Sequence, residues 1–330
     1  MQTRKLGTTG PTVSALGLGA MGMSDFYGDA DRAESLATLA AAVEAGITLI
    51  DTGDFYGMGH NELLIAEALK TLPRDRLVLS VKFGAQRGPD SAFLGFDARP
   101  AAVKTALAYS LKRLGVDHID VYRPARLDPA VPIEDTVGAI AELVQAGYVR
   151  HIGLSEVGAE TIRRAAAVHP IVDLQIEYSL LSRGIEAAIL PTCRALGIAI
   201  TAYGVLGRGL IGGHAVQVDA AGDFRGHSPR FQGENLKTNL DLAAALRAAG
   251  EGIGLTPAQA AIAWVAAQGA DIVPLVGARK PERLAEALGA LTTALSPDAL
   301  AALERAVPKG AAAGDRYPAM QMAMLDSERG

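Results

Sequence analysis

Short apolar runs alternate along the chain with longer stretches of helical composition. Apolar runs of this length are typical of strands that are buried on both faces of a sheet. They lie at residues 13–19, 47–50, 76–82, 118–122, 149–154, 172–176, 198–202 and 272–275. Helices are predicted between and after them, over 31–45, 61–69, 99–114, 132–146, 158–168, 184–196, 237–249, 257–268, 281–291 and 297–307. The pattern therefore predicts eight strands, each followed by at least one helix.

Strict alternation of strands and helices indicates right-handed crossovers and a parallel sheet. Eight such units in 330 residues fit a closed (β/α)8 barrel, the TIM barrel, in which residues 1–330 form a single domain. An open doubly wound sheet is the alternative, but no G-x-G-x-x-G follows the first strand, as its dinucleotide-binding variant requires. Residues 3–8 and 12–17 predict an N-terminal hairpin ahead of the barrel, and the last helix and the tail follow it. Residues 204–236 form one long irregular connection, which favours a functional loop.

Composition narrows the class of partner. The net charge is −5, which argues against nucleic acid as the main partner. One cysteine, Cys193, excludes an internal disulfide and fits a reducing compartment. Neither a leader-type apolar segment nor a run of membrane-spanning length is present. We therefore expect a cytoplasmic protein, monomeric or homo-oligomeric, that acts on a small molecule and needs neither a membrane nor a metal site.

Candidate chemistry falls at the carboxyl ends of the predicted strands, where barrel enzymes place their active sites. Asp51 ends the second strand, Tyr56 follows it in a glycine turn, and Lys82 ends the third strand. A buried ammonium needs a partner, and Asp51 on the neighbouring strand is the natural one. A structural ion pair and a packed tyrosine would explain this set without chemistry. Alternatively, the ammonium lowers the pKa of the Tyr56 phenol from about 10, and the phenol exchanges protons.

Several further segments, together with this one, resemble the aldo-keto reductases over nearly the whole chain. They are Asp51-Thr-Gly-Asp-Phe-Tyr56-Gly, Ser80-Val-Lys82-Phe-Gly, Gly153-Leu-Ser155-Glu156, Gln175-Ile-Glu-Tyr178, Ala202-Tyr203-Gly-Val-Leu206-Gly207-Arg208-Gly209, and Gly277-Ala-Arg279-Lys280 with Arg283-Leu-Ala-Glu286. The family fold is the (β/α)8 barrel, in agreement with the strand count. The resemblance implies an NADPH-dependent reductase of aldehydes or ketones.

The resemblance also implies a role for each matching residue. Tyr56 would protonate the carbonyl oxygen while hydride arrives from the nicotinamide, and Lys82 and Asp51 would tune Tyr56. Ser155 and Gln175 would hold the carboxamide, and Tyr203 would stack on the ring. The remaining cofactor contacts would come from Met21, Asp51, Leu206, Gly207, Gly209, Gly277 and Glu286. Arg279, Lys280 and Arg283 suit the 2′-phosphate of NADPH, since guanidinium groups at a helix start bind phosphate well; a solvated helix end is the alternative.

One departure from the family concerns the fourth strand. The family usually carries a histidine after it, but Ala125 stands there in Tyr122-Arg123-Pro124-Ala125-Arg126. Tyr56 and Lys82 suffice in one interpretation. In a second, Arg123, of the same strand parity as Ala125, supplies a fixed cation; its alternative is a buried ion pair, for instance with Glu177. In a third, the protein binds the cofactor with little turnover.

Smaller features bear on ligand and substrate. Glu156 and Ala287 replace asparagines that often contact the cofactor in relatives. Apolar residues near the predicted mouth favour an apolar or aromatic carbonyl, although each also suits a core: Met21, Phe26, Phe55, Phe83 and Phe93. Some pyridoxal reductases resemble the chain in the Asp-Phe-Tyr-Gly segment and in the altered fourth strand, so pyridoxal is an alternative substrate. A cofactor-binding regulatory or channel-associated subunit is the alternative from another class.

Overall fold

Eight parallel strands close into a barrel in the computed structural model, which describes residues 1–24, 26–214, 223–292 and 294–329. Each strand pairs with its neighbours in chain order, and the last returns to the first. The strands are β3 (Gly17–Gly19), β4 (Leu49–Gly53), β5 (Val78–Phe83), β8 (Ile119–Pro124), β9 (Val149–Ser155), β10 (Ile171–Glu177), β11 (Ala199–Tyr203) and β12 (Ile272–Gly277). The predicted (β/α)8 barrel is therefore confirmed.

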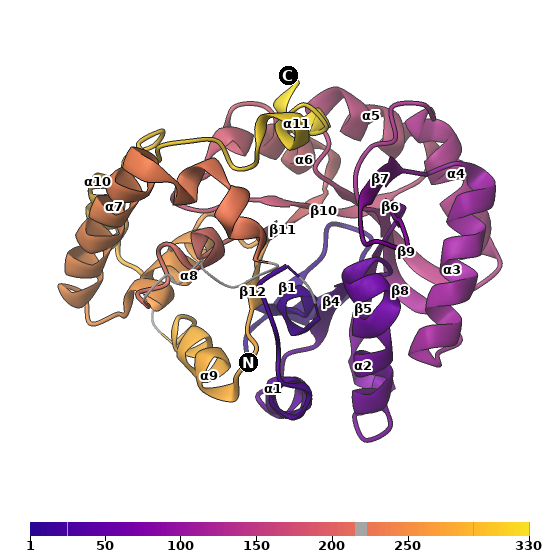
Figure 1. The fold of residues 1–330 in the computed structure, drawn as a ribbon, viewed down its shortest axis with the longest axis horizontal. Coiled ribbons are helices and arrows are strands. Elements are labelled where there is room, and N and C mark those ends of the chain that lie inside the picture. Colours follow the sequence, from indigo (N-terminus) through magenta and orange to yellow (C-terminus); the bar gives the residue numbers. More distant parts are fainter. Residues whose placement is uncertain (25, 215–222, 293, 330) are drawn as a thin grey trace.

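Helices surround the strands (Figure 1). The chain turns back over the outside of the barrel after each strand, as right-handed crossovers require. The helices are α1 (Arg32–Glu44), α2 (His60–Leu69), α3 (Pro100–Leu114), α4 (Ile133–Gln145), α5 (Ala159–Val168), α6 (Ile189–Leu196), α7 (Gly233–Glu251), α8 (Pro257–Ala267), α9 (Pro281–Gly289), α10 (Pro297–Ala306) and the short α11 (Ala319–Met322). Among the described residues, no helix is both long and apolar enough to cross a membrane.

Local sequence explains where these helices begin. The Asp31 carboxylate caps α1 by accepting from the Glu34 amide at 2.8 Å. Thr256 and Gln259 form a reciprocal capping box at the start of α8, with Pro257 at the first helical position. Ser296 caps α10 in the same way as Asp31 caps α1, at 3.1 Å from the Ala299 amide.

The structure corrects four details of the predicted elements. The run at 13–19 is two strands, β2 (Thr12–Ser14), which pairs with β1 (Thr3–Lys5) in the N-terminal hairpin, and β3. A second hairpin, β6 (Ala85–Arg87) with β7 (Phe93–Phe96), follows β5 and was not predicted, because its residues lack a clear alternation. The stretch from 184 starts as a 3₁₀ turn before α6, and the loop at 204–236 contains 3₁₀ turns and the first turn of α7. Residues 215–222 of that loop lie outside the described residues.

The barrel interior is layered, since alternate residues of each strand point inward. The lowest layer is apolar and continues into the N-terminal hairpin, which closes this end with Leu6 and Val13. Its other members are Leu49, Val78, Val121, Val172, Ala199 and Val273. The interior layers above it carry polar side chains, and these are buried: Asp51, Ser80, Lys82, Arg123, Asp173, Gln175 and Thr201. Barrel interiors usually fill these layers with branched apolar side chains. The polar layers point to chemistry at the carboxyl end.

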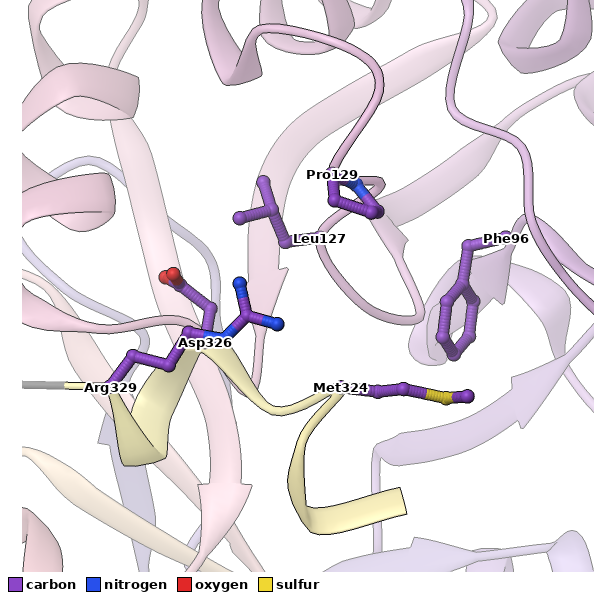
Figure 2. A pocket seen from close by; sticks show the side chains of 6 residues that line it. All are labelled: Phe96, Leu127, Pro129, Met324, Asp326 and Arg329. Carbon is purple, nitrogen blue, oxygen red and sulfur yellow. The ribbon is translucent and has the colours of Figure 1, made fainter. Parts of the chain in front are cut away.

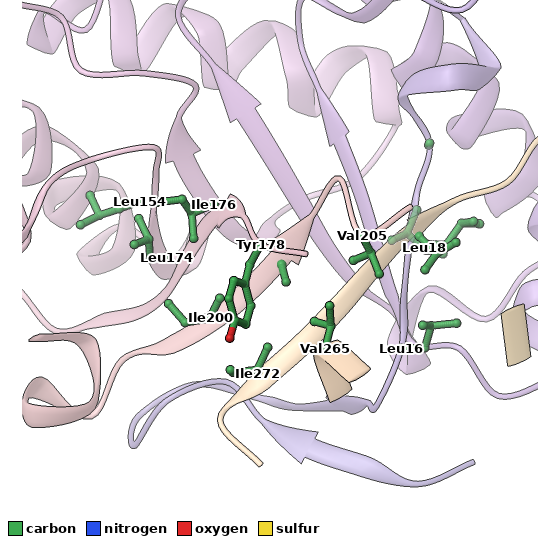
Figure 3. Packing of buried hydrophobic residues seen from close by; sticks show 14 of the residues in the cluster. Leu16, Leu18, Leu154, Leu174, Ile176, Tyr178, Ile200, Val205, Val265 and Ile272 are labelled. Atoms are coloured by element: carbon green, nitrogen blue, oxygen red, sulfur yellow. The ribbon is translucent and has the colours of Figure 1, made fainter. Parts of the chain in front are cut away.

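The outward faces of the strands supply the main hydrophobic core between barrel and helices (Figure 3). Leu18, Leu154 and Leu174 from the strands are fully buried there, and Val265 packs in from α8. Phe83 also belongs to this core, because it is fully buried and stacks on Tyr122 with ring centroids 4.3 Å apart. Of the two possibilities that the sequence left open for Phe83, the mouth and the core, the structure shows the core, because strand parity turns the side chain outward.

Candidate active site

Asp51 is the centre of a hydrogen-bonded cluster at the carboxyl ends of β4, β5 and β10. Its Oδ1 accepts from Lys82 Nζ in a short ion pair. Its Oδ2 accepts from the Ser80 hydroxyl at 2.8 Å and from Gln175 Nε2 at 2.7 Å. Burial lowers the pKa of Lys82, and the Asp51 carboxylate opposes that shift. The predicted partnership of Asp51 and Lys82 is present, and every polar neighbour of Asp51 in this cluster is a donor.

Tyr56 lies directly above this cluster. It begins a 3₁₀ turn after β4, and Gly57 and Met58 in that turn have positive φ values of 55° and 53°. The Lys82 ammonium is 5.1 Å from the centroid of the Tyr56 ring. Phe26 and Phe55 flank the ring edge-on, with centroids at 6.2 and 4.7 Å. The structure thus brings Asp51, Tyr56 and Lys82 together, and only 3%, 6% and 4% of each residue is exposed.

The expected lowering of the Tyr56 pKa is wrong for this structure. Burial and then the Asp51 carboxylate raise the pKa of Tyr56 well above its usual value, and Arg126 opposes them. The Lys82 ammonium, 5.1 Å from the centroid of the ring, does not outweigh burial. Tyr56 therefore remains a phenol at neutral pH, which is the protonation state that a proton donor needs.

Arg123 points into the barrel, as its parity predicts, but below the mouth. Its Nη2 lies 3.1 Å from Asp173 Oδ2 and donates to the Ser80 hydroxyl at 3.0 Å. Both members of this ion pair are fully buried. The carboxylate partner is Asp173 and not Glu177, the residue suggested by sequence. Gly153 leaves the pair its space, since a Cβ there would lie 2.6 Å from Asp173 Oδ1 and 3.0 Å from Arg123 Nε.

A second arginine, Arg126, enters the mouth after Ala125, where β8 has ended. Ala125 itself is buried and offers no side-chain donor. The Arg126 guanidinium donates to the Ala125 carbonyl at 2.6 Å and lies 3.4 Å from Ser155 Oγ and 3.5 Å from Tyr317 Oη. Sequence reasoning missed Arg126, because a residue just beyond a strand end has no parity that predicts its direction.

Two carboxylates at the ends of β9 and β10 hold the C-terminal tail across the mouth. Arg316 is bidentate to Glu156, at 2.8 Å to Oε2 and 3.0 Å to Oε1, and its Nη1 is 3.3 Å from Glu177 Oε2. Arg208 binds the same Glu177 oxygen at 2.9 Å. Glu156 has a left-handed φ of 52°, and Arg316, with burial opposing it, holds the pKa of that carboxyl far below its usual range. The sequence alone did not indicate these ion pairs.

Tyr203 and Tyr317 complete the closure. Tyr203 ends β11, and its hydroxyl donates to Glu156 Oε1 at 2.7 Å and lies 2.9 Å from the Tyr317 hydroxyl. The Arg208 guanidinium covers the Tyr317 ring at 4.3 Å from its centroid. A crevice of about 60 Å³ marks the seam between tail and barrel. Figure 2 shows its lining by Phe96 of β7, by Leu127 and Pro129 after β8, and by Met324, Asp326 and Arg329 of the tail.

The residues predicted to bind a cofactor fall in two groups. Met21, Ser155, Gln175, Tyr203 and Gly277 lie at strand ends around the mouth or directly after them, and Leu206, Gly207 and Gly209 lie in the turn after β11. The other group is at the start of α9. Arg279 donates to the backbone carbonyls of Tyr27 and Asp29 at 3.2 and 3.0 Å, and Lys280 lies 3.3 Å from Glu34. Glu286 binds His214 at 2.9 Å, and Arg283 contacts the same imidazole.

Asp54, in the turn before Tyr56, gives the site a pH-dependent stability. Burial, and then the nearby Glu62 carboxylate, raises the pKa of Asp54 to about 7. The folded protein then holds a proton that the unfolded chain, with an aspartate pKa of about 3.9, releases, so stability falls as pH rises from about 4 to about 7.

We expect Asp54→Asn to remove this slope. The free energy of unfolding is measured in urea at pH 5.5 and at pH 8. Relative to wild type, the variant should be about 2 kcal/mol more stable at pH 8 than at pH 5.5, since each pH unit contributes about 1.4 kcal/mol. Asp75→Asn, at an exposed turn, is the matched control. An equal wild-type-to-variant difference at both pH values would show that Asp54 is ionised in the folded state.

Comparison with known proteins agrees with this geometry. The model of the aldo/keto reductase family matches residues 15–308. The chain is 44% identical over 322 residues to the probable aldo-keto reductase 1 of Glycine max, covering 96% of this chain and 92% of that protein.

Solved structures show the same fold. The glycerol dehydrogenase from Gluconobacter oxydans superposes with a TM-score of 0.83 at 28% identity, over 92% of this chain and 94% of that one. An aldo-keto reductase from Bacillus halodurans, in its holo form, superposes with a TM-score of 0.77 at 25% identity, over 93% and 96% of the two chains. By fold, site and relatedness, the chain belongs to the aldo/keto reductase family, whose oxidoreductases act on small-molecule carbonyl compounds with a nicotinamide cofactor.

Proposed function

We propose that this protein is an NADPH-dependent reductase that converts an aldehyde or ketone to the alcohol, acting as a single barrel domain. The observation that carries the proposal is the buried Tyr56 phenol beside the Lys82–Asp51 pair at the carboxyl end of the barrel. A phenol that keeps its proton at neutral pH can donate it to a carbonyl oxygen. The net reaction consumes one carbonyl compound, one NADPH and one proton, and yields the alcohol and NADP⁺.

The side chains around the mouth fit a nicotinamide cofactor. Gln175 uses its amide N–H on Asp51, which leaves its carbonyl oxygen as an acceptor for a carboxamide N–H. The Ser155 hydroxyl is buried, and its contact to Arg126 is long, at 3.4 Å, so it is free to rotate toward the same group. Tyr203 ends the neighbouring strand β11, in register with Glu177 of β10. When bound, the cofactor supplies the hydride.

Residues of the chain then carry out the proton transfer. Tyr56 gives its proton to the carbonyl oxygen as negative charge develops there. The Lys82 ammonium, held by Asp51, stabilises the phenolate that results. Asp51 is itself held by Ser80, and Ser80 by Arg123, so Arg123 acts as a positioning residue two hydrogen bonds from the ion pair. Access to Tyr56 requires the segment that carries Arg316 and Tyr317 to move from the mouth.

The experiment that tests the function is a turnover assay with purified protein. NADPH oxidation is followed with aromatic and aliphatic aldehydes, ketones and pyridoxal, and the alcohol product is identified. We expect turnover with at least one apolar or aromatic carbonyl, because Phe26 and Phe55 flank Tyr56. Tight NADPH binding without turnover on any member of the panel would favour the non-enzymatic alternative.

Cofactor preference is a separate prediction. Arg279, Lys280 and Arg283 gather at the start of α9, where backbone amides and cations both favour a phosphate group. We expect NADPH to bind about 10–100-fold more tightly than NADH, since a hydrogen bond to a charged group contributes about 1.5–3 kcal/mol. Fluorescence titration of both cofactors measures the ratio. Arg283→Ala should reduce it, and Arg164→Ala on α5, which pairs with Glu134, should not. Equal affinities would remove the phosphate role from these three residues.

A further inference from the structure

Arg126 is a half-buried cation at the mouth, and it forms no ion pair with any carboxylate of the described residues. Its contacts within the part of the chain that the structure describes are the Ala125 carbonyl and, at 3.4 and 3.5 Å, the hydroxyls of Ser155 and Tyr317. The other guanidinium groups around the mouth are ion-paired, Arg208 and Arg316 with Glu177 and Arg316 also with Glu156. A guanidinium carries five N–H donors, and the three contacts of Arg126 occupy at most three of them. Arg126 is therefore suited to receive an oxygen ligand.

Arg126 also lies near the groups that would perform the reaction. Its charge opposes the burial and the Asp51 carboxylate that raise the pKa of Tyr56, and it adds to the burial that lowers the pKa of Lys82. Arg126 contacts Ser155 and Tyr317, which both lie at the mouth. Arg123, the other arginine of this segment, forms an ion pair with Asp173 one layer below. The Tyr317 hydroxyl, which also contacts Tyr203, shows that an oxygen atom fits between Arg126 and the mouth.

We propose that Arg126 donates a hydrogen bond to the carbonyl oxygen of the substrate and stabilises the charge that develops on it, in the place where Ala125 has no donor. The inference rests on the proposed function and concerns how the carbonyl is oriented in front of Tyr56. On binding, the substrate oxygen replaces the long contact from the Tyr317 hydroxyl. Hydride adds to the carbonyl carbon, the C=O π pair moves to oxygen between Arg126 and Tyr56, and the Tyr56 proton completes the alcohol.

A guanidinium in this role differs from an imidazole in its response to pH. Arginine keeps its charge at every pH at which the protein is folded, whereas a histidine titrates near pH 6.5. We therefore expect the pH profile of kcat/KM to show no ionisation of the carbonyl-orienting group near pH 6.5.

Steady-state kinetics of Arg126→Leu test the proposal. Loss of one donor to a developing oxyanion lowers kcat by about 10²–10³-fold, so we expect a fall of this size with little change in KM for NADPH. Arg126→Lys should retain part of the rate, because the charge and one donor remain. Arg163→Leu, on the exposed side of α5, is the matched control for loss of a surface guanidinium. Folding of each variant is checked by its melting temperature.

A pair of substrates separates this role from recognition of an anionic substrate. In Arg126→Leu, kcat for benzaldehyde and kcat for 4-carboxybenzaldehyde should fall by the same factor. A loss confined to KM for the carboxylated aldehyde would overturn the proposal and assign Arg126 to binding of the substrate carboxylate. Unchanged kcat for both aldehydes would also overturn it.

A second variant keeps the test decisive if the first folds poorly. Ala125→His combined with Arg126→Lys introduces the imidazole beside a retained cation, and we expect kcat above that of Arg126→Lys alone, with a new ionisation near pH 6.5 in kcat/KM. Absence of both the gain and the ionisation would contradict the assignment of this position to carbonyl orientation. A wild-type protein without NADPH-dependent turnover would refute the proposed function and this inference with it. Wild-type turnover that survives in Arg126→Leu would refute this inference alone.

Discussion

Replacing Tyr56 with phenylalanine is expected to lower kcat/KM for carbonyl reduction by about 10²–10⁴-fold, the contribution typical of a positioned general acid. The hydroxyl is the only atom lost, and the Phe26 and Phe55 contacts with the ring remain. Folding stability and affinity for NADPH should therefore change little. Steady-state kinetics, with fluorescence titration of NADPH and a melting curve, separate these three quantities.

Tyr122→Phe is the matched control for Tyr56→Phe. Tyr122 is also fully buried, but it lies on the outward face of β8, and its hydroxyl donates to the Val103 carbonyl at 3.2 Å. Its loss should reduce stability by about 1 kcal/mol and leave kcat/KM unchanged. If Tyr56→Phe retains wild-type kcat/KM while Tyr122→Phe behaves as expected, Tyr56 is not the proton donor.

Removing the carboxylate of the buried pair inside the barrel is expected to have the largest effect on stability. Asp173→Ala leaves the Arg123 guanidinium at the centre of the barrel with Ser80 as its remaining partner, and Asp173 and Arg123 are both fully buried. Breaking a buried pair in this way costs about 3–5 kcal/mol. Denaturation in urea measures the loss, which should appear as a lower midpoint at an unchanged slope.

The double variant Arg123→Leu with Asp173→Leu separates the cost of an unpaired charge from the loss of an attraction. Because it buries no charge, it should be more stable than Asp173→Ala alone. A double variant that is less stable than Asp173→Ala would show that the pair contributes net attraction, and would contradict this account.

The single variant Arg123→Leu should lower kcat/KM much less than Arg126→Leu, since Arg123 reaches Asp51 only through Ser80.

Sequence reasoning succeeded where periodicity and strand ends carry the information. The alternation of apolar runs with helical stretches predicted the closed barrel, because parallel strands buried on both faces leave that pattern. Asp51, Lys82 and Gln175 were placed together because the ends of parallel strands meet at one rim. The hydrogen bonds of Asp51 to Lys82 and Gln175 confirm that placement.

The same reasoning failed where burial and direction matter. The pKa of Tyr56 depends on desolvation, which no pattern of residue types reports, and desolvation outweighs the nearby ammonium. Arg123 and Arg126 are three residues apart, and parity alone gave Arg123 the inward direction. The structure shows that both are drawn inward, to different layers, because β8 ends between them.

By itself, the sequence determined the barrel, the order of its strands and the set of polar side chains at its rim, because these depend on local periodicity and on the geometry of parallel strands. Only the tertiary structure decided which charges meet. Arg316 reaches Glu156 across a separation of 160 residues, Arg123 finds Asp173 in a layer below the mouth, and Arg126 forms no ion pair with a carboxylate of the described residues. Such pairings follow from the distances and burial of side chains in the folded chain, which residue type and spacing along the sequence do not specify.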